Sequence, residues 1–142
     1  MTQGRPLVDP YKTPPLSFID LFAGCGGLSL GLEQAGFTPV FVNELNDDAL
    51  ASYQVNRSDE FPYLSVTPFF TKDVKDLVVD TKKLDDVKSS LKNFHGIDVE
   101  NTGRDLDLLV GGPPCQGYSG IGHRRSYSVD KKQLISNHLY QD

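Results

Sequence analysis

The 142-residue sequence lacks several features that would assign it at once to a large class of proteins. It has no apolar run near the ~20 residues that a membrane-spanning helix requires, so nothing suggests a membrane protein. Its two cysteines lie far apart, which predicts neither a disulfide framework nor metal-ligand spacing. It has no excess of basic residues: the net charge is -5, which argues against broad nonspecific nucleic-acid binding by this chain alone.

The first residues also lack the basic-then-apolar order of a secretory signal. Residues 1–16 contain four prolines (Pro6, Pro10, Pro14 and Pro15) and few large apolar groups, so we expect an extended N-terminal arm on a cytoplasmic protein. With 38% hydrophobic and 23% charged residues, the chain has an ordinary globular composition. Residues 17–142 are enough for one domain with a buried core.

Short apolar runs alternate with amphipathic stretches along the chain, in the manner of βαβ units. The expected fold class is therefore α/β, a Rossmann-like sheet with helices on both faces. Gly36 and the pair His95-Gly96 are expected to end helices, and Arg57 to lie at a helix end where its charge suits the dipole. The pattern predicts strands at residues 17–22, 39–43, 69–71 and 106–110, and helices at residues 28–35, 47–56 and 84–94.

The first expected strand runs into a glycine-rich turn at residues 22–27, where glycine lets the backbone approach a ligand closely. By itself this pattern is weak, because tight packing would use similar glycines. Glu44 strengthens it, since an acidic side chain about 20 residues past such a loop can accept hydrogen bonds from both ribose hydroxyls of an adenosine group. A solvated strand-end carboxylate is the alternative for Glu44. Cys25 is expected to fill a small site in the loop rather than to react.

The second informative segment, residues 111–116, has the sequence Gly-Gly-Pro-Pro-Cys-Gln and follows the apolar run at 106–110. It places Cys115 just past an expected buried strand, where an open α/β sheet keeps its chemistry. A lone cysteine beside an apolar strand is often a structural thiol. The flanking glycines, prolines and glutamine favour a reactive thiol instead.

Together, the run Asp-Leu-Phe-Ala-Gly-x-Gly-Gly at residues 20–27 and the Pro-Cys-Gln motif at 114–116 resemble the DNA (cytosine-5) methyltransferase family, N-terminal catalytic portion. The resemblance runs from about residue 18 to residue 140. It implies the fold of an S-adenosylmethionine-dependent methyltransferase, S-adenosylhomocysteine as product and double-stranded DNA as substrate, with no metal. A turn without G-x-G-x-x-G spacing also favours S-adenosylmethionine, which has no pyrophosphate. The implied cofactor-binding residues are Phe22, Ala23, Gly24, Gly26, Gly27, Glu44, Leu45, Asp73, Val74 and Pro113.

The resemblance also implies the reacting residues, which are Cys115, Gln116 and Ser119. The Cys115 thiolate would add to C6 of a cytosine turned out of the duplex, C5 would take the methyl group, and loss of the C5 proton would expel the thiolate. Amino-group methyltransferases carry an aromatic residue where Cys115 stands, so chemistry at ring carbon is favoured. Phosphate contact or a solvated loop face are both possible for the basic residues that follow, His123, Arg124, Arg125, Lys131 and Lys132.

Family members also carry a Glu-Asn-Val motif and a target-recognition region, which these 142 residues do not contain. Residues 99–101 read Val-Glu-Asn but precede the expected nucleophile, so they are no substitute. We therefore expect a second polypeptide or a missing C-terminal part to complete the enzyme. Two alternatives stay open: a tRNA cytosine-5 methyltransferase of the same architecture, and a noncatalytic S-adenosylmethionine-binding module.

Overall fold

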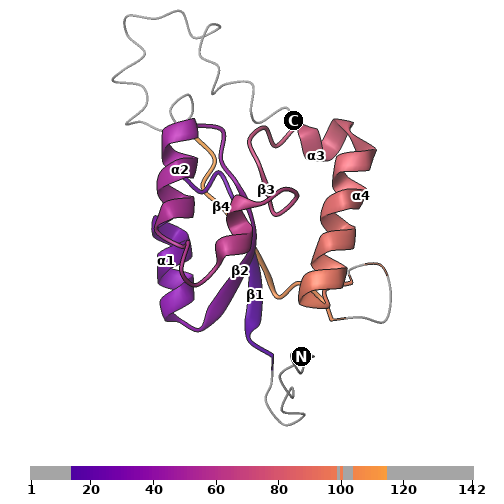
Figure 1. The fold of residues 1–142 in the computed structure, drawn as a ribbon, viewed down its shortest axis with the longest axis horizontal. Helices are drawn as coiled ribbons and strands as arrows, with labels where there is room; N and C mark the ends of the chain where they lie inside the picture. The colour runs from indigo at the N-terminus through magenta and orange to yellow at the C-terminus, as the bar shows by residue number, and fades with distance from the viewer. Residues whose placement is uncertain (1–13, 99, 101–103, 115–142) are drawn as a thin grey trace, which may run out of the picture.

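A parallel sheet covered by helices on both faces makes up the part of the chain that the computed structural model describes, residues 14–98, 100 and 104–114. Helices α1 (Gly27–Gln34) and α2 (Asp47–Val55) cover one face, and α4 (Thr81–Ser90) covers the other (Figure 1). This arrangement confirms the expected α/β class. The strands lie in the order β3-β2-β1-β4 and are β1 (Leu16–Leu21), β2 (Phe37–Asn43), β3 (Phe70–Thr71) and β4 (Leu108–Gly111).

The order of the strands reverses direction at β1. The chain moves outward from β1 to β2 and β3, then returns to place β4 on the opposite side of β1, and each neighbouring pair is parallel. In open α/β sheets, ligands bind outside the carboxyl ends of the strands at such a reversal. The topology therefore directs attention to the end of β1.

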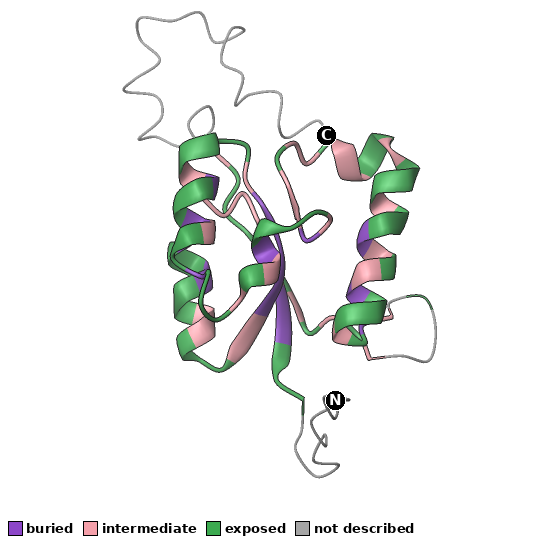
Figure 2. Cartoon of the chain, in the orientation of Figure 1, coloured by how far each residue is buried: buried purple, intermediate pink, exposed green. Residues whose placement is uncertain are grey.

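Two apolar clusters pack against the sheet, one beneath α4 and the other beneath α2. In β1, alternate residues point to opposite faces. Ile19 and Leu21 of β1 pack toward the cluster beneath α4, whereas Asp20 bonds to Ser29 of α1 on the opposite face. Figure 2 shows buried residues along the sheet and on the inner sides of the helices. The α4 cluster contains Val40, Phe41, Val87, Leu91 and Ile97, and the α2 cluster contains Val42, Leu50, Tyr53 and Leu64.

Several helix ends follow from local chemistry. Gly36 has φ 91° after α1 and Gly96 has φ 71° after the π-helical turn η2 (Leu91–His95), so both expected glycine stops are confirmed. Asp80 caps α4 by accepting a hydrogen bond from the Lys83 N–H at 3.2 Å. This cap starts α4 three residues before the expected residue 84.

The structure differs from expectation at several other boundaries. The short helices η1 (Pro62–Ser65) and α3 (Asp76–Val79) were not expected, because four residues are too few to show helical periodicity. Strand β1 ends before Phe22, whose φ of 57° leaves the extended region, and β4 starts only at Leu108. Leu16, expected in the arm, belongs to β1. No helix among the described residues is long and apolar enough to cross a membrane.

Candidate functional site

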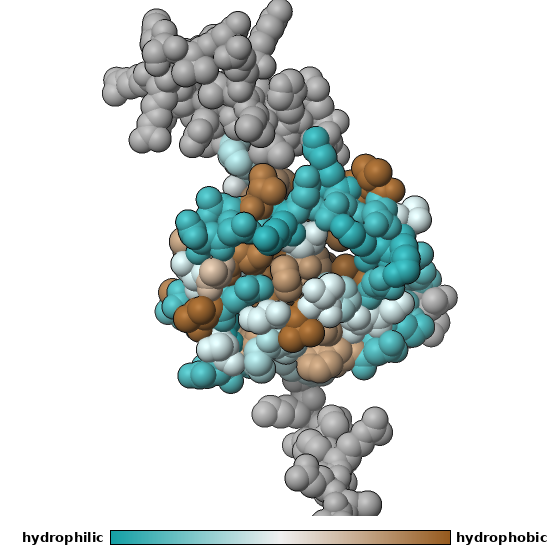
Figure 3. Space-filling view, turned by 45° about the horizontal axis from the view of Figure 1, so that its top comes forward, coloured by the Kyte–Doolittle hydropathy of each residue, from teal (hydrophilic) through white to brown (hydrophobic). Residues whose placement is uncertain are grey.

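A cavity of about 610 Å³ opens at the carboxyl ends of the strands, at the reversal in strand order. The carboxyl edge is turned toward the viewer in Figure 3, where hydrophilic side chains cover much of the upper surface and hydrophobic patches lie between them. Each of the four strands contributes to the lining through the residues at or just past its end. They are Phe22, Asn43, Glu44, Leu45, Asn46, Asp47, Asp48, Lys72, Asp73, Val74, Gly112 and Pro114.

The turn after β1 is fixed to the end of β2 by three hydrogen bonds. The Phe22 N–H donates to Asn43 Oδ1 at 3.2 Å, and the Ala23 N–H donates to the Asn43 carbonyl oxygen at 3.0 Å. The Gly24 N–H donates to Glu44 Oε2 at 2.7 Å. Phe22 adopts φ 57°, a left-handed conformation uncommon outside glycine, and this strain is stored at the cavity wall.

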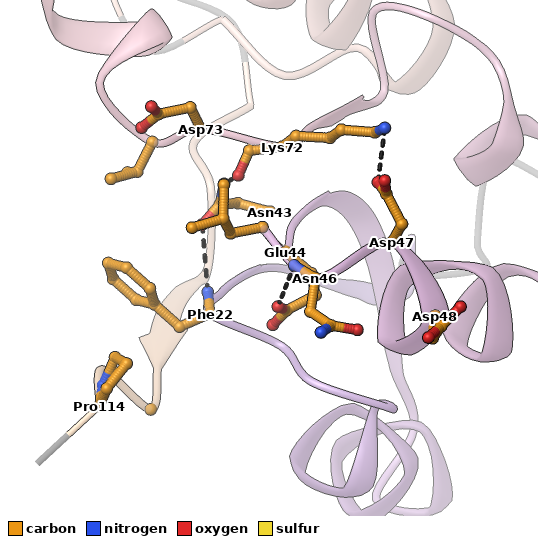
Figure 4. Close-up of a pocket in the computed structure, with 12 residues that line it drawn as sticks. Phe22, Asn43, Glu44, Asn46, Asp47, Asp48, Lys72, Asp73 and Pro114 are labelled. Carbon is orange, nitrogen blue, oxygen red and sulfur yellow. Dashed lines mark hydrogen bonds and ion pairs between the residues drawn. The ribbon is translucent and has the colours of Figure 1, made fainter. Parts of the chain in front are cut away.

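Glu44 is half-buried and held by two backbone donors, of which Figure 4 shows the bond from Asn46. Besides the bond from Gly24, its Oε1 accepts a hydrogen bond from the Asn46 N–H at 2.8 Å. A carboxylate offers about four acceptor positions, so two remain for a ligand. The alternative of a merely solvated carboxylate is not what the structure shows, because Glu44 joins the glycine turn to the start of α2.

Asn43 is a site residue that the sequence reading missed. Its side chain is 1% exposed, and its Nδ2 donates to the carbonyl oxygens of Thr71 at 3.2 Å and Lys72 at 2.9 Å. With the bond from Phe22, this one amide joins the ends of β1, β2 and β3. An asparagine at a strand end gives no such signal in sequence, because its partners lie in other strands.

Asp73 and the ion pair beside it form the wall beyond β3. Asp73 Oδ1 accepts a hydrogen bond from the Lys75 N–H at 3.0 Å, and Asp73 also lines the cavity. Lys72 Nζ lies 2.5 Å from Asp47 Oδ1 (Figure 4). Asp47 and Asp48, the acidic residues in the first turn of α2, line the cavity as well.

The lining is acidic. Four carboxylates, those of Glu44, Asp47, Asp48 and Asp73, line the cavity against the single ammonium of Lys72. Clefts lined by charge of one sign concentrate ligands of the opposite sign. A cavity of this kind attracts a cationic ligand and repels an anionic group such as a pyrophosphate.

The expected cofactor-binding residues divide into two sets. Phe22, Glu44, Leu45, Asp73 and Val74 line the cavity directly. The remaining ones are not among its lining residues: Ala23, Gly24, Gly26, Gly27 and Pro113. In the turn after β4, it is Gly112 and Pro114 that line the cavity in place of Pro113.

The glycines serve different purposes. Gly26 has φ 90°, and a Cβ there would lie 2.5 Å from Arg57 Nη1 and 2.7 Å from Tyr53 Cδ2. At Gly111 a Cβ would lie 2.9 Å from the Leu21 carbonyl oxygen, so close packing of β4 on β1 explains this glycine. Gly112 has open space around it.

One expectation about a side chain near the turn is wrong: Cys25 is exposed instead of filling a small site. Arg57 follows the end of α2, as expected, but it is also 5% exposed and packs beneath the glycine turn. The expected reacting residues Cys115, Gln116 and Ser119 lie outside the described residues, as do His123, Arg124, Arg125, Lys131 and Lys132.

Comparisons with known proteins agree on one family. The Methanocaldococcus jannaschii protein M.MjaORF1200P is 35% identical over 139 aligned residues, covering 78% of this chain and 38% of that protein. DNA (cytosine-5)-methyltransferase 1 of Mus musculus is 35% identical over 131 residues, 90% of this chain and 7% of that protein. Type II methyltransferase M.XorII of Xanthomonas oryzae is 36% identical over 121 residues, 85% of this chain and 24% of that protein.

Among solved structures, a prophage-encoded Escherichia coli protein has a TM-score of 0.44 and 29% identity, over 79% of this chain and 26% of that chain. The present chain thus spans well under half the length of each of these relatives. The model of the C-5 cytosine-specific DNA methylases matches residues 16–139. Because this match covers most of the chain and includes both the glycine turn and the Pro-Cys-Gln motif, the protein belongs to the C-5 cytosine-specific DNA methylase family.

Proposed function

We propose that the cavity binds S-adenosylmethionine, and that the protein to which this chain contributes transfers its methyl group to C5 of cytosine in DNA. The observation that carries the proposal is the fixed carboxylate of Glu44 at the reversal in strand order, in a chain of this family. Two of the named relatives are DNA cytosine-5 or type II methyltransferases.

The cavity suits the cofactor in shape and in charge. Glu44 has acceptor positions free for two ribose hydroxyls, and Asp73 offers a carboxylate for an exocyclic amine of the adenine. Phe22 and the exposed Leu45 supply apolar surface for the adenine ring. When bound, S-adenosylmethionine supplies an activated methyl group on a positively charged sulfur, and the acidic lining favours that charge over the pyrophosphate of a dinucleotide.

The nucleophile is proposed to be Cys115, the residue after Pro114. The neighbouring residue Pro114 lines the cavity, which supports the proposal. The thiolate adds to cytosine C6, which makes C5 nucleophilic, and C5 then takes the methyl group. Loss of the C5 proton restores the C5–C6 double bond and expels the thiolate. Gln116 and Ser119 are proposed to contact the DNA around the extruded base.

A further protein part is proposed to complete the enzyme, either a second polypeptide or a longer C-terminal region. The length of the relatives supports this, because the chain covers 38% or less of the three named above. The outer strand of the sheet supports it too: among the described residues β4 pairs only with β1, and Leu109 is 60% exposed. An apolar strand edge of this kind is suited to a further strand.

Calorimetric titration of the chain with S-adenosylmethionine tests the cofactor site. Glu44→Ala is expected to weaken binding at least about tenfold, the equivalent of one lost charge-assisted hydrogen bond. Asp85→Ala removes the same charge from the exposed face of α4 and is expected to leave affinity unchanged. Equal affinity of the Glu44→Ala and unsubstituted chains would remove Glu44 from the site.

Cys115→Ser in the completed enzyme tests the chemistry. The hydroxyl is a far poorer nucleophile at neutral pH, so methyl transfer to DNA should be abolished while S-adenosylmethionine still binds. Assays on DNA and on tRNA, each with tritiated cofactor, identify the substrate. Transfer to tRNA alone, or transfer that survives the substitution, would contradict the proposal.

A further inference from the structure

Arg57 lies in an unusual place for a charged residue, beneath the glycine turn and 5% exposed. All three of its guanidinium nitrogens have partners. Nε forms an ion pair with Glu33 Oε1 at 2.6 Å, Nη1 donates to the Tyr53 carbonyl oxygen at 3.3 Å, and Nη2 donates to the Gly26 carbonyl oxygen at 3.0 Å. The guanidinium carbon also stacks 3.9 Å from the centroid of the Tyr53 ring.

The bond to Gly26 acts on the part of the turn that starts α1. The same Gly26 carbonyl oxygen accepts the Leu30 N–H at 2.9 Å, which is the first bond of the helix, and the Gly26 N–H donates to the Ala23 carbonyl oxygen at 3.0 Å. Arg57 fills the space in which a Cβ of residue 26 would stand. The guanidinium therefore holds the turn in position and leaves room only for glycine at residue 26.

The turn is held from two sides. On the cavity side, Glu44 accepts the Gly24 N–H at 2.7 Å. On the buried side, Arg57 binds Gly26, two residues further on, and is itself held by Glu33 of α1. A charged group this deeply buried is stable only when its partners are in place, so the geometry is strongly specified.

We infer that Arg57 is a positioning residue for the cofactor, which sets the affinity of the site by holding the Phe22–Gly27 turn from behind without touching the ligand. The inference rests on the proposed function, because the turn matters for affinity only if the cavity binds the cofactor. A positioned turn keeps Phe22 and Glu44 in their binding geometry before the ligand arrives, and such preorganisation lowers the ordering cost of binding.

Arg57→Lys is the informative variant, since it keeps the charge but removes the planar fork that bonds to Gly26 and Glu33 together. The expected result is a rise of about tenfold in the Kd for S-adenosylmethionine, measured by calorimetry at a temperature where the chain is fully folded. Leu91→Ala serves as the matched control. It removes a core side chain on the other face of the sheet and should leave the Kd unchanged despite its own loss of stability.

Amide hydrogen exchange supplies a readout that needs no cofactor. Arg57→Lys should speed exchange at the amides of Gly26 and Leu30, which bond within the turn, and leave the amides of α4 as they were. If Arg57→Lys does not fold, Glu33→Gln is used instead. It retains Arg57 but removes the charge of its partner, and the same two amides should exchange faster.

The outcomes separate the inference from the proposed function. If the unsubstituted chain binds S-adenosylmethionine, Glu44→Ala binds it weakly and Arg57→Lys binds it normally, the inference is overturned and the cofactor site stands. If the unsubstituted chain does not bind at all, the proposed function fails together with the effect on affinity. Unchanged exchange at Gly26 and Leu30 would overturn the positioning role in either case.

Discussion

The two faces of the sheet bury different kinds of groups. Beneath α4 the core is almost entirely apolar, with Val87, Leu91 and Ile97 packed against β2. Beneath α1 and α2 the core also contains Asp20, Ser29 and Arg57, all at most 5% exposed. Arg57 of this polar face bonds to the glycine turn at Gly26. The difference teaches that one layer of this fold supplies stability, while the other combines stability with positioning of the site.

The polar face is organised as a chain of hydrogen bonds. Ser29 Oγ donates to Asp20 Oδ2 at 2.6 Å and lies 2.8 Å from the Tyr53 hydroxyl, and Tyr53 in turn stacks on Arg57. Burial raises the pKa of Tyr53 to about 12, so its hydroxyl remains protonated at neutral pH and available as a donor. Such connected networks specify one arrangement of side chains, in contrast to the apolar packing opposite.

Among the variants that test this difference between the two faces, Leu91→Ala is expected to have the largest effect on the free energy of unfolding. Leu91 is 6% exposed in the α4 cluster, so truncating it should lower the free energy of unfolding by about 2–5 kcal/mol. Urea denaturation measures this loss. At a temperature where the variant is still folded, its Kd for S-adenosylmethionine should match that of the unsubstituted chain, and a weaker Kd would show that the two faces do not act separately.

His95 gives the α4 face a characteristic response to acid. Burial lowers the pKa of His95 from 6.5 to about 4, with the positive charge of Arg104 adding to the effect, and its Nε2 has no partner among the described residues. The unfolded chain therefore binds the proton first, and stability is lost as the pH falls from about 6.5 to about 4. His95→Phe, which suits the rings of Tyr63 and Phe69 around it, should flatten this part of the curve of unfolding free energy against pH.

Asp20 should give the opposite face the opposite response. Burial raises the pKa of Asp20 above its usual 3.8, although the bond from Ser29 and the charge of Arg57 act against burial. The folded state then binds the proton more tightly, so stability falls as the pH rises from 3.8 through the raised value. Asp20→Asn should remove that decline. A difference curve between variant and unsubstituted chain that is level across this range would contradict the assignment.

The smallest expected effects come from a matched pair of helix caps, one on each face. Asn46 Oδ1 accepts the Ala49 N–H at the start of α2, and Asp80 Oδ1 accepts the Lys83 N–H at the start of α4. Replacing either by alanine should lower the free energy of unfolding by about 1 kcal/mol. Only Asn46→Ala should also weaken S-adenosylmethionine binding, because Asn46 lines the cavity. Equal affinities for the two variants would contradict this difference.

What the sequence predicted was local in origin. The glycine turn, the acidic residue at the end of β2 and the glycine stops after α1 and η2 each follow from a few neighbouring residues, and all are present in the structure. Glu44 and Asp73 line one cavity because parallel strands end at the same edge. Motifs that place an acidic residue at a strand end therefore predicted two residues that line the same cavity.

What the sequence did not predict depends on contacts across the fold. Arg57 has the charge expected at a helix end, but its burial depends on distant partners, Glu33 at 24 positions and Gly26 at 31 positions along the chain. Asn43 is an ordinary strand residue until its amide meets the ends of two other strands. Pro113 and Pro114 are adjacent prolines, and which of them lines the cavity depends on how β4 lies against β1.

The bonds of Asn43 also connect ligand binding with correct folding. Its side chain reaches both Phe22 and Lys72 only when β1, β2 and β3 are paired in their native alignment. A slip of one residue between strands would turn Asn43 to the opposite side of the sheet and take Glu44 out of place beside it. Misaligned molecules would thus form no binding site. The fraction of molecules that binds the cofactor would therefore measure the fraction in which these strands are paired in the native alignment.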